Sequence, residues 1–200
     1  MYRLAGAPSL LERLRAIGVG PGEIDVVVNT HLHFDHAGGN TRAQDGDVVP
    51  TFPRARYVVQ HGEWEDALHP HERSRASYRE DDFLPLAETG QLQLVDGEAE
   101  IAPGVRVVPT GGHTRHHQAV VVEDHGLVVA SDLLPTTRHV RLPWLMSFDL
   151  YPEAVLEAKR RLLADAALRG TALLFYHDAE RPLGRVRASG DGYVVDEVAA

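Results

Sequence analysis

Cysteine is absent from all 200 residues of the chain. Its absence excludes both a disulfide framework and a thiolate metal ligand. A metal site would have to use other donors, and histidine is plentiful, with 12 residues. Imidazole and carboxylate ligands suit zinc and its neighbours among the divalent metals.

Lysine is nearly absent as well, and almost all basic residues are arginine. Lys159 is the only lysine, which we interpret as a composition bias of the genome, and the formal net charge is −9. An acidic surface repels phosphate backbones, so the charge argues against a nucleic-acid partner.

Long apolar runs are also missing. No segment approaches the ~20 residues that a membrane-spanning helix needs, and Met1-Tyr2-Arg3 does not open a signal peptide. We therefore expect no membrane partner and take the cytoplasm as the default location. The length suits a single domain over residues 1–200.

The six residues from His31 to His36 are the most informative part of the chain. They read H-L-H-F-D-H and follow an apolar run, Ile24 to Val28, that is typical of a strand. The first two histidines alternate, so their side chains can point the same way from an extended backbone. Asp35 and His36 follow where the strand gives way to a turn.

Three further stretches place His or Asp at the ends of apolar, strand-like runs. They are Gly111-Gly112-His113, Ser131-Asp132 and Tyr176-His177. Such a pattern is expected of a site that is built at one edge of a β-sheet from distant parts of the sequence.

The periodicity of apolar residues predicts mixed α and β structure. Helices are expected at Ser9–Ile17, Glu63–Leu68 and Pro152–Leu168. Strands are expected at Ile24–Val28, Ala55–Gln60, Gln91–Val95, Val105–Pro109, Ala119–Glu123, Leu127–Ala130, Thr171–Tyr176, Leu183–Ala188 and Tyr193–Val198. Residues 69–84 are polar and predict a loop with a helical piece. Residues 142–148 lack a clear period and predict a lid loop that also forms a substrate wall.

The order H-x-H-x-D-H, then a distant His, an Asp and a last His resembles the metallo-β-lactamase superfamily, from about Leu10 onward. The resemblance implies an α/β fold, the αββα metallo-β-lactamase sandwich. It also implies two divalent metal ions, with zinc as the default and manganese, iron or cobalt as alternatives. By the family pattern, one ion would be held by His31, His33 and His113, the other by Asp35, His36 and His177, with Asp132 bridging them.

The chemistry implied by this resemblance is hydrolysis. Two ions in such a site share a hydroxide that attacks a carbonyl or phosphoryl centre. The catalytic carboxylates would be Asp35 and Asp132, and Asp35 could also relay a proton. No organic cofactor is implied.

Within the superfamily, the chain resembles a subgroup of N-acyl-homoserine lactone lactonases and organophosphate hydrolases. The likeness rests on the stretch from Asp25 through the Gly38-Gly39-Asn40 turn, on Val59-Gln60 before Glu63-Trp64, and on Phe148-Asp149-Leu150-Tyr151. It implies a small lactone or ester substrate, with phosphotriester hydrolysis as a side activity. One alternative is a thioesterase or β-lactamase-type hydrolase, and another is a non-catalytic or weakly active fragment or subunit of a longer hydrolase.

The chain departs from the family pattern at three places. The opening strands and their Asp-Thr-Gly-like turn have no counterpart, so we expect an N-terminally shortened sandwich. The exposed sheet edge would invite pairing, which makes a homodimer one option. Arg115 and His116 replace the Pro-Gly pair of G-H-T-P-G-H, and Pro135 stands where some lactonases have a tyrosine.

The remaining histidines and the aromatic residues have weaker signals. His117 is predicted to be structural and to pack behind His113. Solvated loop positions are predicted for His61, His69, His71, His125 and His139. Candidates for an apolar pocket beside the metals are Trp64, Phe83, Trp144, Met146 and Phe148, with a core position favoured for Trp64.

Overall fold

The computed structural model describes residues 8–197. Met1-Tyr2-Arg3, where no signal peptide is expected, and Val198, the end of the last expected strand, lie outside the described residues. The described chain forms two compact units. Unit 1 holds residues 8–59 and 67–93, and unit 2 holds residues 60–66 and 94–197. The prediction of one domain over residues 1–200 stays a prediction.

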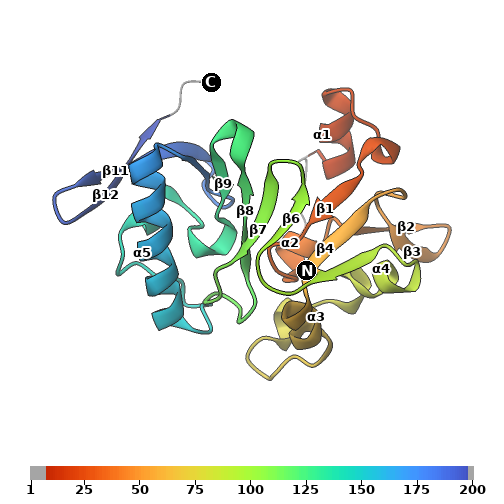
Figure 1. The fold of residues 1–200 in the computed structure, drawn as a ribbon. Coiled ribbons are helices and arrows are strands. Elements are labelled where there is room, and N and C mark those ends of the chain that lie inside the picture. Colours follow the sequence, from red (N-terminus) through yellow and green to blue (C-terminus); the bar gives the residue numbers. More distant parts are fainter. Residues whose placement is uncertain (1–7, 198–200) are drawn as a thin grey trace. The chain divides into compact units, whose positions relative to one another are not determined.

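Unit 1 is built on a three-stranded sheet with the strand order β1-β4-β5, and it also contains a separate hairpin, β2-β3. Figure 1 labels all of the following elements except β5. From the first helix to the last of these strands, the elements are α1 (Leu10–Ala16), β1 (Val26–Val28), α2 (Phe34–Ala37), β2 (Thr41–Gln44), β3 (Asp47–Pro50), β4 (Arg56–Gln60), α3 (His61–Leu68), α4 (Leu84–Glu88) and β5 (Leu92–Val95). Most of α3 belongs to unit 2, because residues 61–66 lie in that unit.

Local sequence explains how this unit begins. Ser9 caps α1, since its hydroxyl accepts a hydrogen bond from Glu12 N while the Glu12 carboxylate accepts one from Ser9 N. This reciprocal pair is a capping box, which satisfies two backbone donors of the first turn. β1 then runs parallel to β4, with Val26 paired to Arg56.

A buried tyrosine ties the sheet of unit 1 to the turn that follows the histidine motif. Tyr57 on β4 is fully buried. Its hydroxyl donates to Asn40 O at 3.1 Å and accepts from Phe52 N at 3.0 Å. The residue at the end of the Gly38-Gly39-Asn40 turn is therefore fixed against the core strand.

Unit 2 contains a seven-stranded sheet with the order β12-β11-β10-β9-β8-β7-β6. β9 and β10 are parallel, and the other neighbouring pairs are antiparallel. The elements are β6 (Ala99–Ala102), β7 (Val105–Pro109), β8 (Gln118–Val122), β9 (Leu127–Val129), α5 (Pro152–Arg169), β10 (Ala172–Leu174), β11 (Leu183–Ser189) and β12 (Gly192–Glu197). Short 3-10 turns, η5 (Ser131–Leu133) and η6 (Thr137–Val140), follow β9.

The long helix α5 covers one face of this sheet (Figure 1). Leu163 and Ala166 pack in one cluster with Leu173 and Phe175, all buried. The helix starts at a proline in its first turn and ends at Gly170, whose φ of 67° is the left-handed conformation that glycine adopts at helix ends. Its predicted range, Pro152–Leu168, is thus confirmed to within one residue.

Two strand regions were not predictable from periodicity. The β2-β3 hairpin turns at Asp45-Gly46, both with positive φ, which is a common two-residue hairpin turn. The flanking residues of β2 are mostly exposed and polar, so they lack the alternation that reveals a strand. The short β6, which carries a register irregularity between Glu100 and Ala102, was missed for a similar reason.

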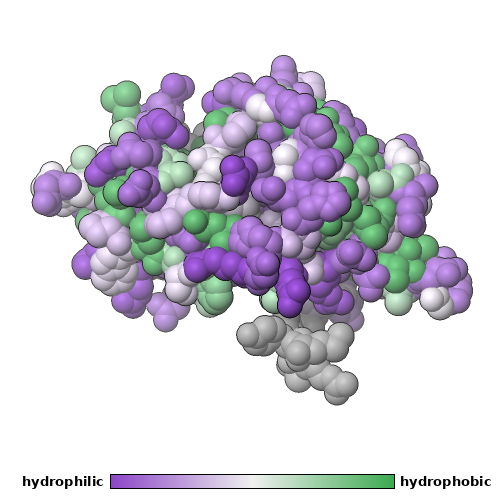
Figure 2. Space-filling model, turned by 90° about the horizontal axis from the view of Figure 1, so that it is seen from below, coloured by the Kyte–Doolittle hydropathy of each residue, from purple (hydrophilic) through white to green (hydrophobic). Residues whose placement is uncertain are grey.

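The surface has a mixed character. Figure 2 shows a face on which hydrophilic residues predominate and hydrophobic ones are interspersed. No helix within residues 8–197 combines the length and the apolar character that crossing a membrane requires.

Candidate metal centre

The motif His31 to His36 lies in unit 1, directly after β1. Pairing with β4 continues past the strand, since Asn29 N donates to Val58 O at 3.0 Å. His33 has an extended backbone and is the N-cap residue of α2. The extended backbone thus ends between the alternating histidines and the Asp-His pair, as the sequence predicts, but the chain enters the short helix α2 there and not a turn.

The imidazole rings of the motif gather within unit 1. The ring centroids of His31 and His33 are 4.6 Å apart, and those of His31 and His36 are 4.2 Å apart. His31 and His33 are buried, whereas Asp35 is exposed, with its carboxylate 3.6 Å from His36 Nε2. Three imidazoles beside a carboxylate form the donor set that zinc and similar ions accept.

Strand register brings Asp132 and His177 together in unit 2. Val129 at the end of β9 pairs with Leu174 at the end of the parallel strand β10. Asp132 follows Val129 by three positions, and His177 follows Leu174 by the same interval. Both residues therefore lie just beyond the same edge of the sheet, at equivalent positions after the two paired strands.

The carboxylate of Asp132 lies between two imidazoles. Its Oδ2 is 3.2 Å from His113 Nε2, and its Oδ1 is 3.1 Å from His177 Nε2. Two ligands that bind one zinc ion tetrahedrally at about 2.1 Å are roughly 3.4 Å apart. The distance from each carboxylate oxygen to its neighbouring imidazole nitrogen is thus close to the distance expected between two ligands of one zinc ion.

The backbone just before Asp132 is strained. Ser131 is fully buried and has a φ of 49°, in the left-handed region that residues other than glycine rarely adopt. Such strain persists where the surroundings hold a residue firmly, often at functional sites.

A second carboxylate orients His113. Its Nδ1 lies 3.0 Å from Asp149 Oδ1, and both side chains are almost completely buried. With Nδ1 turned to Asp149, the Nε2 atom faces Asp132. Metal-binding histidines are commonly held in this way, by a carboxylate on the nitrogen that does not bind the ion.

Gly112 lets the His113 loop approach α5 closely. Its φ is 96°, and a Cβ atom there would lie 2.6 Å from Val155 Cγ2. Gly112 O accepts from Tyr151 N at 2.9 Å, and His113 O accepts from Leu150 N at 3.1 Å. Glycine is therefore required before His113 for its conformation and for its lack of a side chain.

The turn that carries His177 is fixed by its own hydrogen bonds. His177 N donates to Pro135 O at 2.9 Å, so the residue that replaces a tyrosine of some lactonases contributes its carbonyl. The Asp178 carboxylate accepts from the Thr137 hydroxyl, from Thr137 N and from two N–H groups of its own turn. Partial burial acts to raise the pKa of Asp178, but these hydrogen bonds outweigh it and hold the pKa well below its ordinary value.

The residues present fit a metal site. The seven predicted ligands are among the His and Asp side chains of the chain that could hold a metal ion. Within unit 2, the oriented imidazole of His113 and the spacing of Asp132 both match what a divalent ion requires.

The other predicted positions have mixed outcomes. His117 is fully buried, with its ring centroid 6.2 Å from that of His113 and its Nδ1 2.6 Å from Thr110 Oγ1, which confirms a structural role. His139 differs from the prediction, because it is half-buried and its Nδ1 lies 2.8 Å from Thr136 Oγ1. His61, His69, His71 and His125 are exposed as predicted, but His61 is the first residue of α3 and does not lie in a loop.

The aromatic candidates also divide. Trp64 is 8% exposed, as expected for a core residue, and Phe83 is fully buried. Trp144 and Phe148 are 44% and 71% exposed. Of the candidates for an apolar contact surface, these two are therefore the accessible aromatic residues.

Three residues were not recognised from the sequence. Asp149 orients His113, Glu63 is fully buried beside the same loop, and Lys159 is fully buried on α5. Lys159 could have been noticed because it is the only lysine of the chain. A composition bias explains why lysine is rare, but it does not explain why this lysine is buried. Asp149 belongs to the Phe148-Asp149-Leu150-Tyr151 stretch that carries the family likeness, but its partner is distant in sequence.

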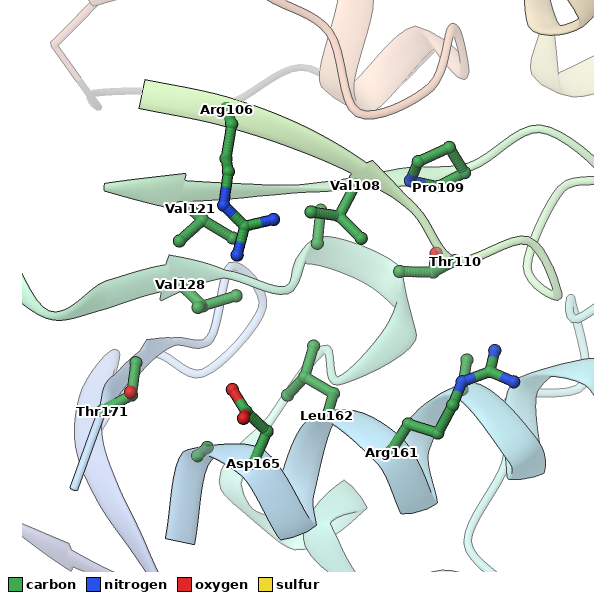
Figure 3. A pocket seen from close by; sticks show the side chains of 13 residues that line it. Arg106, Val108, Pro109, Thr110, Val121, Val128, Arg161, Leu162, Asp165 and Thr171 are labelled. Atoms are coloured by element: carbon green, nitrogen blue, oxygen red, sulfur yellow. The ribbon is translucent and has the colours of Figure 1, made fainter. Parts of the chain in front are cut away.

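A separate cavity of about 280 Å³ lies in unit 2 between α5 and the strands β7, β8 and β9. Figure 3 shows Val108, Val121 and Val128 on its sheet side, and Leu162, Asp165 and Arg161 on α5. None of the seven predicted metal ligands lines it. The guanidinium of Arg106 at this cavity is already paired with Glu98 and Glu123.

Comparison with known proteins defines the class. The sequence profile of the Metallo-beta-lactamase superfamily matches residues 4–177, so the chain belongs to this superfamily. The chain is 29% identical over 173 residues to an N-acyl homoserine lactonase of Bacillus thuringiensis, a match that covers 84% of this chain and 61% of that protein. The chain thus spans less than two thirds of the length of this curated relative.

Solved structures agree. A probable metal-dependent hydrolase from Staphylococcus aureus matches with a TM-score of 0.84 and 29% identity, over 98% of this chain and 71% of that one. An N-acyl homoserine lactone hydrolase with N-hexanoyl-L-homoserine bound at its catalytic metal centre matches with a TM-score of 0.67 and 28% identity, over 86% of this chain and 62% of that one. These neighbours confirm the predicted α/β metallo-β-lactamase fold and the likeness to lactonases.

Proposed function

We propose that this chain is a metal-dependent hydrolase that opens a lactone ring, with N-acyl-homoserine lactones as the substrate class. The observation that carries the proposal is the Asp132 carboxylate, with one oxygen 3.2 Å from His113 Nε2 and the other 3.1 Å from His177 Nε2. Family membership and the lactonases among the relatives support it.

The seven His and Asp residues would act as ligands of two divalent ions, with zinc as the first candidate. His31, His33 and His113 would hold one ion, Asp35, His36 and His177 the other, and Asp132 would be shared. When bound, such a pair of ions activates water and polarises the carbonyl oxygen of the substrate. Asp149 would keep the His113 ring in place through Nδ1.

The reaction that these residues would serve is hydrolysis of the ring ester. Water adds to the lactone carbonyl carbon, the bond to the ring oxygen breaks, and the products are a carboxylate and an alcohol. The departing oxygen needs a proton. Asp35 is the exposed carboxylate of the motif and lies beside His36, so we assign it the relay of a proton, taken from the attacking water and passed to that oxygen.

The apolar part of the substrate would meet aromatic side chains. Trp144 and Phe148 are exposed on the segment that precedes α5. Their segment ends at Asp149, which contacts His113. An acyl chain that lies on these rings would place its lactone head toward the proposed metal ligands.

The test is metal content and hydrolysis measured on the same purified chain. We expect about two ions per chain by elemental analysis, and opening of N-acyl-homoserine lactones in an assay panel that also holds a thioester, a β-lactam and a phosphotriester. Asp132→Ala and His33→Ala should lose both bound metal and turnover. Asp191→Ala and His125→Ala, at exposed positions, are the matched controls and should keep both.

The outcomes separate the alternatives. Full turnover in Asp132→Ala would contradict the proposed ligand set. Bound metal without hydrolysis of any panel compound would favour the non-catalytic alternative. Preference for the thioester or the β-lactam would keep the hydrolase and replace the substrate class.

A further inference from the structure

Lys159, the only lysine of the chain, has an unusual environment. It lies on α5 with no exposed surface. Its Nζ donates to three backbone carbonyls of the segment before the helix, to Arg141 O at 2.9 Å, Leu142 O at 3.2 Å and Trp144 O at 2.7 Å. An ammonium group has three donors, so the three carbonyls use its whole capacity.

The segment that receives these bonds has no regular secondary structure between η6 and α5. Its inner side packs on the core, since Leu142 contacts the cluster around Leu163 and Leu145 contacts the cluster around Val155. Packing of these side chains does not satisfy the backbone carbonyls of the segment, which need hydrogen-bond donors when they are removed from water. Lys159 supplies those donors from a helix that is itself firmly packed.

The far end of the same segment reaches the candidate metal centre. Asp149 N donates to Met146 O at 3.1 Å, and the Asp149 carboxylate accepts from Met146 N at 2.8 Å. The other carboxylate oxygen lies 3.0 Å from His113 Nδ1. One continuous stretch of chain therefore joins the carbonyls held by Lys159 to the carboxylate that orients His113.

We infer that Lys159 is a positioning residue for His113, acting through residues 141–149 and the Asp149 carboxylate. The inference rests on the proposed function, because it takes His113 as a metal ligand. Lys159 itself is not assigned any contact with substrate or metal. Its effect is to limit the positions that Asp149 can take, and so the directions in which His113 Nε2 can point.

The test is the affinity for Zn²⁺, measured by competition with a chromophoric chelator in the full chain. Lys159→Met keeps most of the side-chain volume and removes the donors. We expect it to weaken zinc binding by about 10-fold, and Asp149→Ala by about 10- to 100-fold. Because both act on His113 through one route, the double variant should bind zinc no more than about 2-fold more weakly than Asp149→Ala alone.

The control is Arg160→Met. Arg160 neighbours Lys159 on α5, but it is exposed and pairs with Glu157 on the same helix. Its loss should leave zinc affinity unchanged. Amide hydrogen exchange in the zinc-free chain provides a second measurement, and protection of residues 142–149 should fall in Lys159→Met and not in Arg160→Met.

Two results would overturn the inference. One is a folded Lys159→Met with the zinc affinity of the wild type, and the other is a double variant in which the two losses multiply. Should Lys159→Met not fold, Lys159→Gln retains two amide hydrogens for the carbonyls and should show a smaller loss of affinity. Unchanged affinity in that variant would also overturn the inference.

These measurements need no turnover, so they separate the inference from the proposed function. A wild type that binds zinc tightly but opens no lactone contradicts the proposed function alone. A wild type without measurable zinc affinity overturns both. In variants with activity, loss of position at His113 should lower kcat more than it raises KM for the lactone.

Discussion

The hydroxyl of Thr114 donates a 2.5 Å hydrogen bond to the carboxylate of Glu63, which is fully buried on α3. Thr114 follows His113 directly in the chain. The loop of His113 is therefore attached at two neighbouring residues, through this hydroxyl and through the bond between His113 and Asp149.

Removal of that hydroxyl should destabilise the chain. Thr114→Val keeps the shape of the side chain and takes a donor from a buried carboxylate, so we expect the free energy of unfolding to fall by about 1–3 kcal/mol. Urea unfolding followed by circular dichroism measures it. Thr41→Val is the control, because its hydroxyl donates to the exposed carbonyl of Asp81, and its loss should be within about 0.5 kcal/mol. Equal losses in the two variants would contradict the role assigned to Thr114.

The effect of a methyl group at Gly62 should depend on His116. A Cβ atom at Gly62 on α3 would occupy the place of the His116 ring, so Gly62→Ala should lower stability by about 1 kcal/mol in the wild type. In a His116→Gly background the space is free, and the same substitution should be neutral or stabilising by up to about 1 kcal/mol, because alanine favours a helix. Thermal unfolding of the four chains in this cycle measures the change of sign. The same cost in both backgrounds would show that His116 is not the obstacle.

Stability at alkaline pH should carry a signature of Lys159. Burial lowers the pKa of Lys159 to about 8 in the folded chain, against a smaller opposing effect of the Asp149 carboxylate, while the unfolded side chain keeps its ordinary value of 10.5. Between these values the unfolded chain binds more protons than the folded chain, so this residue's contribution to stability rises with pH. The wild type should therefore gain stability relative to Lys159→Met from about pH 8 to about pH 10.5.

Urea unfolding of both chains across that range measures the difference. Arg160→Met serves as the reference for a charge lost from the surface of the same helix. A difference between wild type and Lys159→Met that stays constant, or that shrinks as the pH rises, would contradict burial as the dominant influence on this amine.

The ligand motif and the long helix were predictable because they depend on short-range patterns. The H-x-H-x-D-H spacing follows a strand and opens a short helix, and α5 shows its apolar face in one stretch of sequence. The β2-β3 hairpin gave no such pattern, since its exposed polar residues do not alternate. Periodicity detects a strand only where one face is buried.

The supports of the candidate site depend on long-range contacts that no local pattern records. Asp149 reaches His113 across the sequence because Tyr151 N and Leu150 N pair with the backbone of the His113 loop. Likewise, Asp132 and His177 meet because two strands are in parallel register. The sequence shows that residue 159 is a lysine, but its burial depends on the segment 141–144, which folds over it.

Lysine chemistry gives this chain a built-in reporter. With one lysine, and that one enclosed, a reagent that acylates side-chain amines meets no accessible lysine on the folded protein. Reaction must wait until residues 141–144 lift from α5 or the whole chain unfolds. The rate at which the tryptic peptide with Lys159 gains mass therefore measures how often these openings occur. The dependence of this rate on urea would distinguish local opening of residues 141–144 from unfolding of the whole chain.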